Sequence, residues 1–133
     1  MILGIGIDTV SVNRIKELIS KFDEKFENKI FTEAEIIKAQ NRKNLSLQAL
    51  FYAKRFAAKE AFSKALGLGI GRGVDFRDIE IDNDKLGKPF INILNGKEKF
   101  IKQHFAVKNF AVHLSLSDEA DSALAMVTIS FLE

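Results

Sequence analysis

The order of apolar and polar positions predicts both helices and paired strands along the chain. Apolar residues recur with helical spacing in some stretches and alternate with polar residues in others. The predicted helices cover residues 11–28 (as one helix or two), 33–41, 45–66 and 96–104. The predicted strands cover residues 2–7, 78–82, 89–94, 109–117 and 122–131. Two antiparallel hairpins combined with helices favour an α+β fold, because strands and helices do not alternate as a doubly wound sheet requires.

Residue signals at the ends of these segments support the boundaries. Thr32 and Glu35 match the capping box that opens a helix. Gly67 follows the long helix and fits a helix C-cap. The segment DNDKLGK, residues 82–88, is rich in turn-forming residues and joins the second and third strands.

The composition limits the class of protein. At 133 residues the chain is long enough for one domain with a hydrophobic core, and we expect a single domain over residues 1–133. No run approaches the ~18 apolar residues that cross a membrane, and the N-terminus, with Asp8 and no basic region, does not resemble a signal peptide. The absence of cysteine excludes disulfides and thiolate chemistry and fits the cytoplasm, where we expect the protein. The net charge of +2 is too small to indicate a nucleic-acid partner.

The first strand has one bare face. Gly4, Gly6 and Asp8 point to one side of it, because side chains alternate along a strand. The glycines allow backbone or ligand to approach closely. Asp8 has two possible roles at this stage: it can cap a helix that begins near Thr9, or it can hold a cation bound to phosphate.

The long helix carries a second carboxylate. Glu60 and Lys64 stand four residues apart on its polar side, in the order that favours an ion pair. Phe56 lies on the same side, and Arg55 intrudes on the apolar side, which suggests a helix that contacts a ligand or another subunit. From periodicity alone, the surface ion pair and a functional site both remain possible.

Two further features carry weaker signals. The glycine-rich GLGIGRG at 67–73 follows a helix, whereas the nucleotide-binding glycine motifs follow a strand, so we interpret it as a flexible loop that allows close approach. In the strand 109–117, His113 and Ser115 share a small polar face that would suit an anionic ligand. His104 lies nine residues upstream in a predicted helix, so a zinc site is not indicated.

Taken together, these segments resemble the bacterial holo-acyl-carrier-protein synthases, the small trimeric group of 4′-phosphopantetheinyl transferases. The resemblance runs through the chain in order. Its most specific part is the combination of the aspartate segment with the KEAFSKA helix. The segments that carry it are GIGIDTVSVNRI (4–15), FTEAEI (31–36), RFAAKEAFSKALGLGIGR (55–72), DIEIDNDKLGKP (78–89) and HLSLSDEADSALAMV (113–127).

The resemblance implies a fold, a reaction and a metal. The fold would be an antiparallel sheet with one long packed helix, and the subunits would form a homotrimer with sites at subunit interfaces. The reaction would move the 4′-phosphopantetheine arm of coenzyme A to a serine of apo-acyl carrier protein, in fatty acid biosynthesis, with release of 3′,5′-ADP. Asp8 and Glu60 would bind Mg²⁺, and Lys64 would contact the diphosphate. The general base would be Glu60 or a metal-bound water, and the sequence does not choose between them.

The resemblance also suggests contacts for the two substrates. The candidates for the nucleotide portion are Arg55, Gly71 in the GLGIGR loop, Gly87, Lys88, Pro89, His113 and Ser115. For the acidic carrier protein, Lys21 and Lys25 would each fall within about 20° of Arg14 on a continuous helix. A mixed, solvated face is the alternative for Lys21 and Lys25.

Two other functions are compatible with parts of the pattern. The chain could be a non-catalytic module that binds coenzyme A or a nucleotide, although such a module would not need both carboxylates and Lys64. A nucleic-acid-binding domain is disfavoured by the low net charge and the absence of tryptophan.

Overall fold

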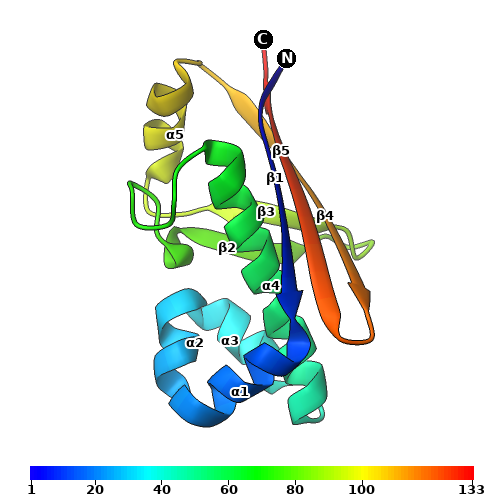
Figure 1. Ribbon diagram of the computed structural model, residues 1–133. Helices are drawn as coiled ribbons and strands as arrows, with labels where there is room; N and C mark the ends of the chain where they lie inside the picture. Colours follow the sequence, from blue (N-terminus) through cyan, green and yellow to red (C-terminus); the bar gives the residue numbers. More distant parts are fainter.

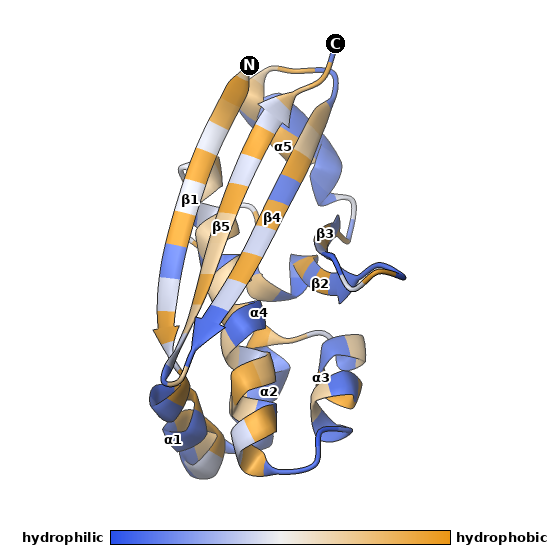
Figure 2. Ribbon diagram, turned by 90° about the vertical axis from the view of Figure 1, so that its right-hand side faces the viewer, coloured by the Kyte–Doolittle hydropathy of each residue, from blue (hydrophilic) through white to orange (hydrophobic).

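The computed structural model describes residues 1–133 and is built around a three-stranded antiparallel sheet. Its strands are β1 (Ile2–Ser11), β5 (Ser122–Phe131) and β4 (Phe110–Glu119), in the order β1-β5-β4. Helix α4 (Leu45–Leu66) lies along one face of this sheet (Figure 2). The α+β class and the long helix packed on an antiparallel sheet are therefore confirmed.

The other elements lie around helix α4 (Figure 1). Three short helices gather at one end of the molecule, and α5 lies near the other end, beside the two chain termini. A separate two-stranded hairpin packs between these ends. None of the helices is both long enough and apolar enough to span a membrane. The elements are α1 (Val12–Phe22), α2 (Glu24–Ile30), α3 (Glu33–Gln40), η1 (Phe76–Asp78), β2 (Ile79–Asn83), β3 (Pro89–Ile93) and α5 (Lys97–Phe105).

The glycines of β1 let α4 approach the strand at backbone distance. A Cβ atom at Gly4 would stand 1.8 Å from the carbonyl oxygen of Ala65, and one at Gly6 would stand 1.8 Å from that of Ala61. No side chain other than hydrogen fits there. The bare face predicted from the sequence is thus occupied by the α4 backbone, and this contact sets how far Asp8 stands from the helix.

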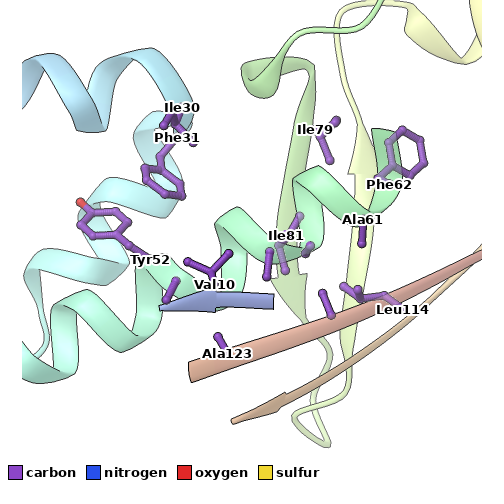
Figure 3. Close-up of a cluster of buried hydrophobic side chains, with 14 of the residues drawn as sticks. Val10, Ile30, Phe31, Tyr52, Ala61, Phe62, Ile79, Ile81, Leu114 and Ala123 are labelled. Atoms are coloured by element: carbon purple, nitrogen blue, oxygen red, sulfur yellow. The ribbon is translucent and has the colours of Figure 1, made fainter. Parts of the chain in front are cut away.

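The two faces of the main sheet differ in what covers them. The inner face packs small and branched side chains of β5, such as Ala125 and Val127, against α4, and Figure 3 shows part of this core. The outer face is not covered within the chain, although it carries large apolar side chains. The exposed fraction is 58% for Ile5, 55% for Ile7 and 47% for Met126.

One predicted boundary is wrong in an informative way, and it decides between the two roles left open for Asp8. Strand β1 runs to Ser11, not to residue 7, because it pairs with β5 along its whole length. The hydroxyl of Ser11, not Asp8, caps α1 by accepting a hydrogen bond from the Arg14 N–H at 3.2 Å. The chain then breaks at Asp23, whose φ of 47° separates α1 from α2.

Local signals elsewhere are confirmed. The capping box of Thr32 and Glu35 is formed in both directions. Gly67 ends α4 in the left-handed conformation with φ of 75°. The later helix and strands begin and end within two residues of their predicted positions.

Candidate active site

Asp8 lies on the inner face of β1, where it meets α4. It follows Gly4 and Gly6 on that face, and its side chain is only 18% exposed. Lys64 on α4 donates to the Asp8 carboxylate, with Nζ 3.1 Å from Oδ1, and to the Ile7 carbonyl oxygen at 2.9 Å. The close packing of strand and helix therefore brings together two of the residues predicted from separate segments.

Glu60 lies one helical turn before Lys64, but the Glu60–Lys64 ion pair that the helical spacing allowed is not formed. Lys64 pairs with Asp8 instead. Partial burial raises the pKa of the Glu60 carboxyl, the nearby Asp8 charge raises that pKa further, and Lys64 opposes both effects. The two carboxylates are thus close enough for the charge of one to affect the other, and the half-exposed Lys64 pairs with Asp8.

This donor set fits a divalent cation. Like charges that repel across a partly buried site are relieved when a metal ion lies between them, and carboxylate oxygens suit Mg²⁺. No group of three or more aspartate, glutamate or histidine side chains is arranged to bind a metal. The chain can therefore supply two carboxylates, and the other ligands would have to come from substrate and water.

Arg55 is joined to the β2–β3 turn by a chain of hydrogen bonds. Its guanidinium donates to Asn83 Oδ1 at 2.8 Å, and the Asn83 side-chain amide donates to the Gly87 carbonyl oxygen at 3.0 Å. Lys88 and Pro89 follow in the same turn and at the start of β3. The structure therefore brings Arg55 together with the Gly87–Pro89 segment that the sequence grouped with it.

Arg55 is almost fully buried and borders a hollow of about 420 Å³. Its guanidinium stacks on the Phe51 ring at 3.8 Å, and burial lowers the pKa of Arg55 to about 10. Arg42 and Lys54 line the same hollow. Sequence reasoning missed Arg42, because it lies in a stretch with no recognisable pattern, outside every segment of the resemblance.

His113 and Ser115 point away from the carboxylates. Both lie on the outer face of the sheet, since Leu114 between them is buried on the inner face. His113 Nε2 is 3.0 Å from the Ser130 hydroxyl oxygen on the neighbouring strand. Within one chain, then, the sheet separates His113 from Asp8.

Gly71 is also apart from the Arg55 hollow. It lies in the loop beyond the end of α4, with φ of 91°, and its N–H donates to the Val74 carbonyl oxygen at 2.9 Å. The loop packs against α5, where Gly73 meets the ring of Phe100. Nothing in the structure connects Gly71 with Arg55.

A groove of about 400 Å³ lies at the helical end of the molecule. Arg14 from α1 and Lys25 from α2 line it, but Lys21 does not and instead stands 5.3 Å over the ring of Phe22. The predicted basic stripe on a continuous helix is wrong, since α1 ends before Lys25. The complete lining comprises Arg14, Leu18, Phe22, Lys25, Phe26, Lys29, Ile30, Phe56 and Phe76.

Most of this groove was not foreseen. Its apolar members come from α1, α2, α4 and η1, which only the fold brings together. Phe56 gave the one sequence signal, as an aromatic residue on the polar side of the long helix. Lys29 adds a third cation at the rim.

The family of the chain follows from comparison with known proteins. Residues 4–127 match the model of the 4'-phosphopantetheinyl transferase superfamily. A holo-[acyl-carrier-protein] synthase from Anaplasma phagocytophilum is 47% identical over 129 residues, which cover 97% of this chain and 98% of that protein. This chain belongs to the 4′-phosphopantetheinyl transferase superfamily, as a member of its holo-acyl-carrier-protein synthase family. The family expected from the sequence is confirmed.

Solved structures of this family have the same fold. A holo-(acyl-carrier-protein) synthase from Bacillus anthracis, crystallised with CoA (3',5'-ADP), aligns with a TM-score of 0.81 at 40% identity and covers 99% of both chains. The Helicobacter pylori enzyme in complex with coenzyme A aligns with a TM-score of 0.76 at 32% identity, covering 95% of this chain and 99% of that one. The transferase class and the family fold are thus established for this chain.

Proposed function

We propose that this chain is a holo-acyl-carrier-protein synthase of fatty acid biosynthesis in the cytoplasm. It transfers 4′-phosphopantetheine from coenzyme A to a serine of apo-acyl carrier protein and releases 3′,5′-ADP. The observation that carries this proposal is the meeting of Asp8, Glu60 and Lys64 where α4 crosses β1. Phosphoryl transfer from a diphosphate needs its charge neutralised and its groups held in line, and this cluster offers both.

Asp8 and Glu60 are the residues proposed to hold Mg²⁺. When bound, the ion would neutralise charge on the diphosphate of coenzyme A. Lys64 is half exposed and bonded to Asp8, so its ammonium can turn to the diphosphate and stabilise the departing 3′,5′-ADP. The serine proton goes to Glu60 or to water in the site.

We propose that the nucleotide part of coenzyme A binds between two copies of the chain, in a homotrimer. Arg55, Asn83 and the Gly87 turn offer hydrogen-bonding groups on the same side of the sheet as α4. His113 and Ser115 lie on the opposite face, so they can join a site with Asp8 only if a second copy presents them. The exposed apolar side chains on that outer face support such an interface, because large uncovered apolar patches mark association surfaces.

The groove at the helical end is the proposed docking site for the carrier protein. Acyl carrier proteins are small, acidic and helical. An apolar floor with Arg14, Lys25 and Lys29 at the rim suits an acidic helix that lays an apolar face into it. Phe56 connects this groove to Glu60, one helical turn further along α4.

A transfer assay tests the proposed reaction. The protein is incubated with coenzyme A, Mg²⁺ and apo-acyl carrier protein, and the carrier is weighed by mass spectrometry. We expect the carrier to gain the mass of one phosphopantetheine group only when all components are present. No gain with several carrier proteins would contradict the reaction and would leave the binding-module alternative.

The shared site has its own test. Glu60→Gln and His113→Ala variants are expressed separately and together, with different tags, and doubly tagged assemblies are purified. Each variant alone should transfer poorly, whereas mixed assemblies should recover part of the activity, because some sites combine an intact Glu60 with an intact His113. Mixed assemblies no more active than the single variants would show that both residues act within one subunit.

A further inference from the structure

The proposed reaction leaves the most deeply buried charge of the molecule without a role. Lys59, immediately before Glu60, has no exposed side-chain surface. Its ammonium donates to Glu35 Oε1 at 2.6 Å, to the Ile30 carbonyl oxygen at 2.7 Å and to the Phe76 carbonyl oxygen at 3.1 Å. A lysine has three donors, and each of them has a different acceptor here.

Glu35 is held as completely as Lys59. One of its oxygens accepts from Lys59 and from the Thr32 N–H at 3.0 Å, and the other accepts from the Ile81 N–H at 2.9 Å. The pair therefore fixes the end of α2, the start of α3, η1 and β2 to one point on α4.

Stability alone does not require an ion pair at this position. Burial lowers the pKa of Lys59, and the charge of Glu35 opposes that shift. Apolar residues of similar volume at such a site are often at least as stabilising as the charges. Apolar residues would not fix the orientation of the Ile30 and Phe76 carbonyl groups relative to α4, because only hydrogen bonds do so.

Those two carbonyl groups belong to residues that line the groove at the helical end, the proposed docking site for the carrier protein. Ile30 and Phe76 both line it, and the Phe76 ring packs edge-on against Phe56 at 5.7 Å. Phe56 and Lys59 lie on the turn of α4 that ends at Glu60. The groove walls and the carboxylate of the reaction site are thus tied to the same helical turn.

We propose that Lys59 and Glu35 form a positioning pair, which holds the apolar groove at a fixed distance and orientation from Glu60. This inference rests on the proposed transfer to a carrier protein. With the pair in place, a carrier docked in the groove presents its serine at the site of Asp8 and Glu60. Without it, α2 and η1 can shift on α4 and the serine is misplaced. Strand β2 also loses its hydrogen bond to Glu35, but its pairing with β3 and the Arg55–Asn83 and Asn83–Gly87 hydrogen bonds hold the contacts offered to coenzyme A in place.

The test separates the two substrates kinetically. The double variant Lys59→Met/Glu35→Met removes both charges and keeps the volume, and Glu35→Gln keeps one acceptor oxygen for Lys59. In the folded variants, kcat/KM for the carrier should fall by roughly 10- to 100-fold, as expected for a small displacement of reacting groups. KM for coenzyme A should change by less than about twofold, because Arg55, Asn83 and Gly87 stay joined by hydrogen bonds that do not involve the pair.

Ile101→Ala is the matched control. Ile101 is fully buried in α5, outside the groove, and its truncation weakens the fold without touching the pair. Assays run well below the unfolding midpoints of all variants. Unchanged kcat/KM for the carrier would overturn the proposal. So would kcat/KM values for the carrier and for coenzyme A that fall together, as in Ile101→Ala. Unfolding of both pair variants would also overturn it, because the pair would then be structural. Lack of transfer by the unmodified protein would instead contradict the proposed function.

Discussion

Two of the lysine–carboxylate pairs of helix α4, which involve Lys59 and Lys64, have opposite properties. Lys59 and Glu35 are both buried, and all three Lys59 donors and both Glu35 oxygens have hydrogen-bond partners. Lys64 is 54% exposed and is held to Asp8 by one 3.1 Å contact and to a carbonyl oxygen. The two pairs therefore have different roles on one helix. The Lys59–Glu35 pair fixes the surrounding elements to α4. The Lys64–Asp8 pair leaves an ammonium and a carboxylate accessible to a substrate.

Breaking the buried pair should have the largest effect on stability. Lys59→Met leaves the Glu35 carboxylate buried without its counter-ion, which typically costs about 3–5 kcal/mol of unfolding free energy. Chemical denaturation followed by circular dichroism measures this loss. A loss below about 1 kcal/mol, the size of an exposed pair, would remove the distinction between the two pairs.

Breaking the exposed pair should affect activity and spare stability. Lys64→Met should change the unfolding free energy by no more than about 1 kcal/mol. It should slow transfer by roughly 10²- to 10³-fold, the size seen when one preorganised charge-stabilising group is lost. Denaturation and the carrier mass assay measure the two effects on the same preparation. An unfolded Lys64→Met protein, or one with full activity, would contradict the assignment of Lys64 to the reaction.

The position of the second pair depends on the glycines of β1. Gly6→Ala places a methyl group against the Ala61 carbonyl oxygen and must push the helix away, at a cost of about 1–3 kcal/mol or more. The same shift should weaken the Asp8–Lys64 contact and slow transfer. Gly69→Ala is the stability control, because nothing lies within 4 Å of the added atom. Equal stability of the two variants would show that the close approach is not required.

The smallest effect distinguishes Asp8 from the true helix cap. Ser11→Ala removes the side-chain acceptor for the Arg14 N–H and should cost about 1 kcal/mol of stability. Transfer should not change, because Ser11 lies outside the site. Asp8→Asn should do the reverse, with loss of transfer and little loss of stability. Thermal unfolding and the mass assay compare the two variants, and a stability loss confined to Asp8→Asn would restore the capping role.

Local signals allowed much of the fold to be predicted, because they act within a few residues. The Thr32–Glu35 capping box and the Gly67 cap depend only on neighbouring backbone groups. The end of β1 was misplaced because its last residues are fixed by pairing with β5, more than one hundred positions away. Asp8 was then open to interpretation as a cap.

The candidate site was predicted only in part, because its residues are distant in the sequence and meet only in the fold. Asp8, Glu60 and Lys64 could be grouped only through the family resemblance, since no local pattern joins residues 56 positions apart. The burial of Lys59 could not be predicted from the sequence pattern, because its hydrogen-bond acceptors lie 17, 24 and 29 residues away in the chain. The separation of His113 from Asp8 likewise required the fold, because only the packing of α4 shows that the two side chains lie on opposite faces of the sheet.

Asp8 and Glu60 are together proposed to hold the divalent cation that the transfer requires. The direct measurement is the rate of carrier modification against Mg²⁺ concentration for the unmodified protein, Asp8→Asn and Glu60→Gln, each verified as folded. We predict no transfer without the cation and a loss of roughly 10²- to 10³-fold or more in both variants. Transfer at the unmodified rate by folded Glu60→Gln, or by the unmodified protein with all divalent cations chelated, would contradict the account.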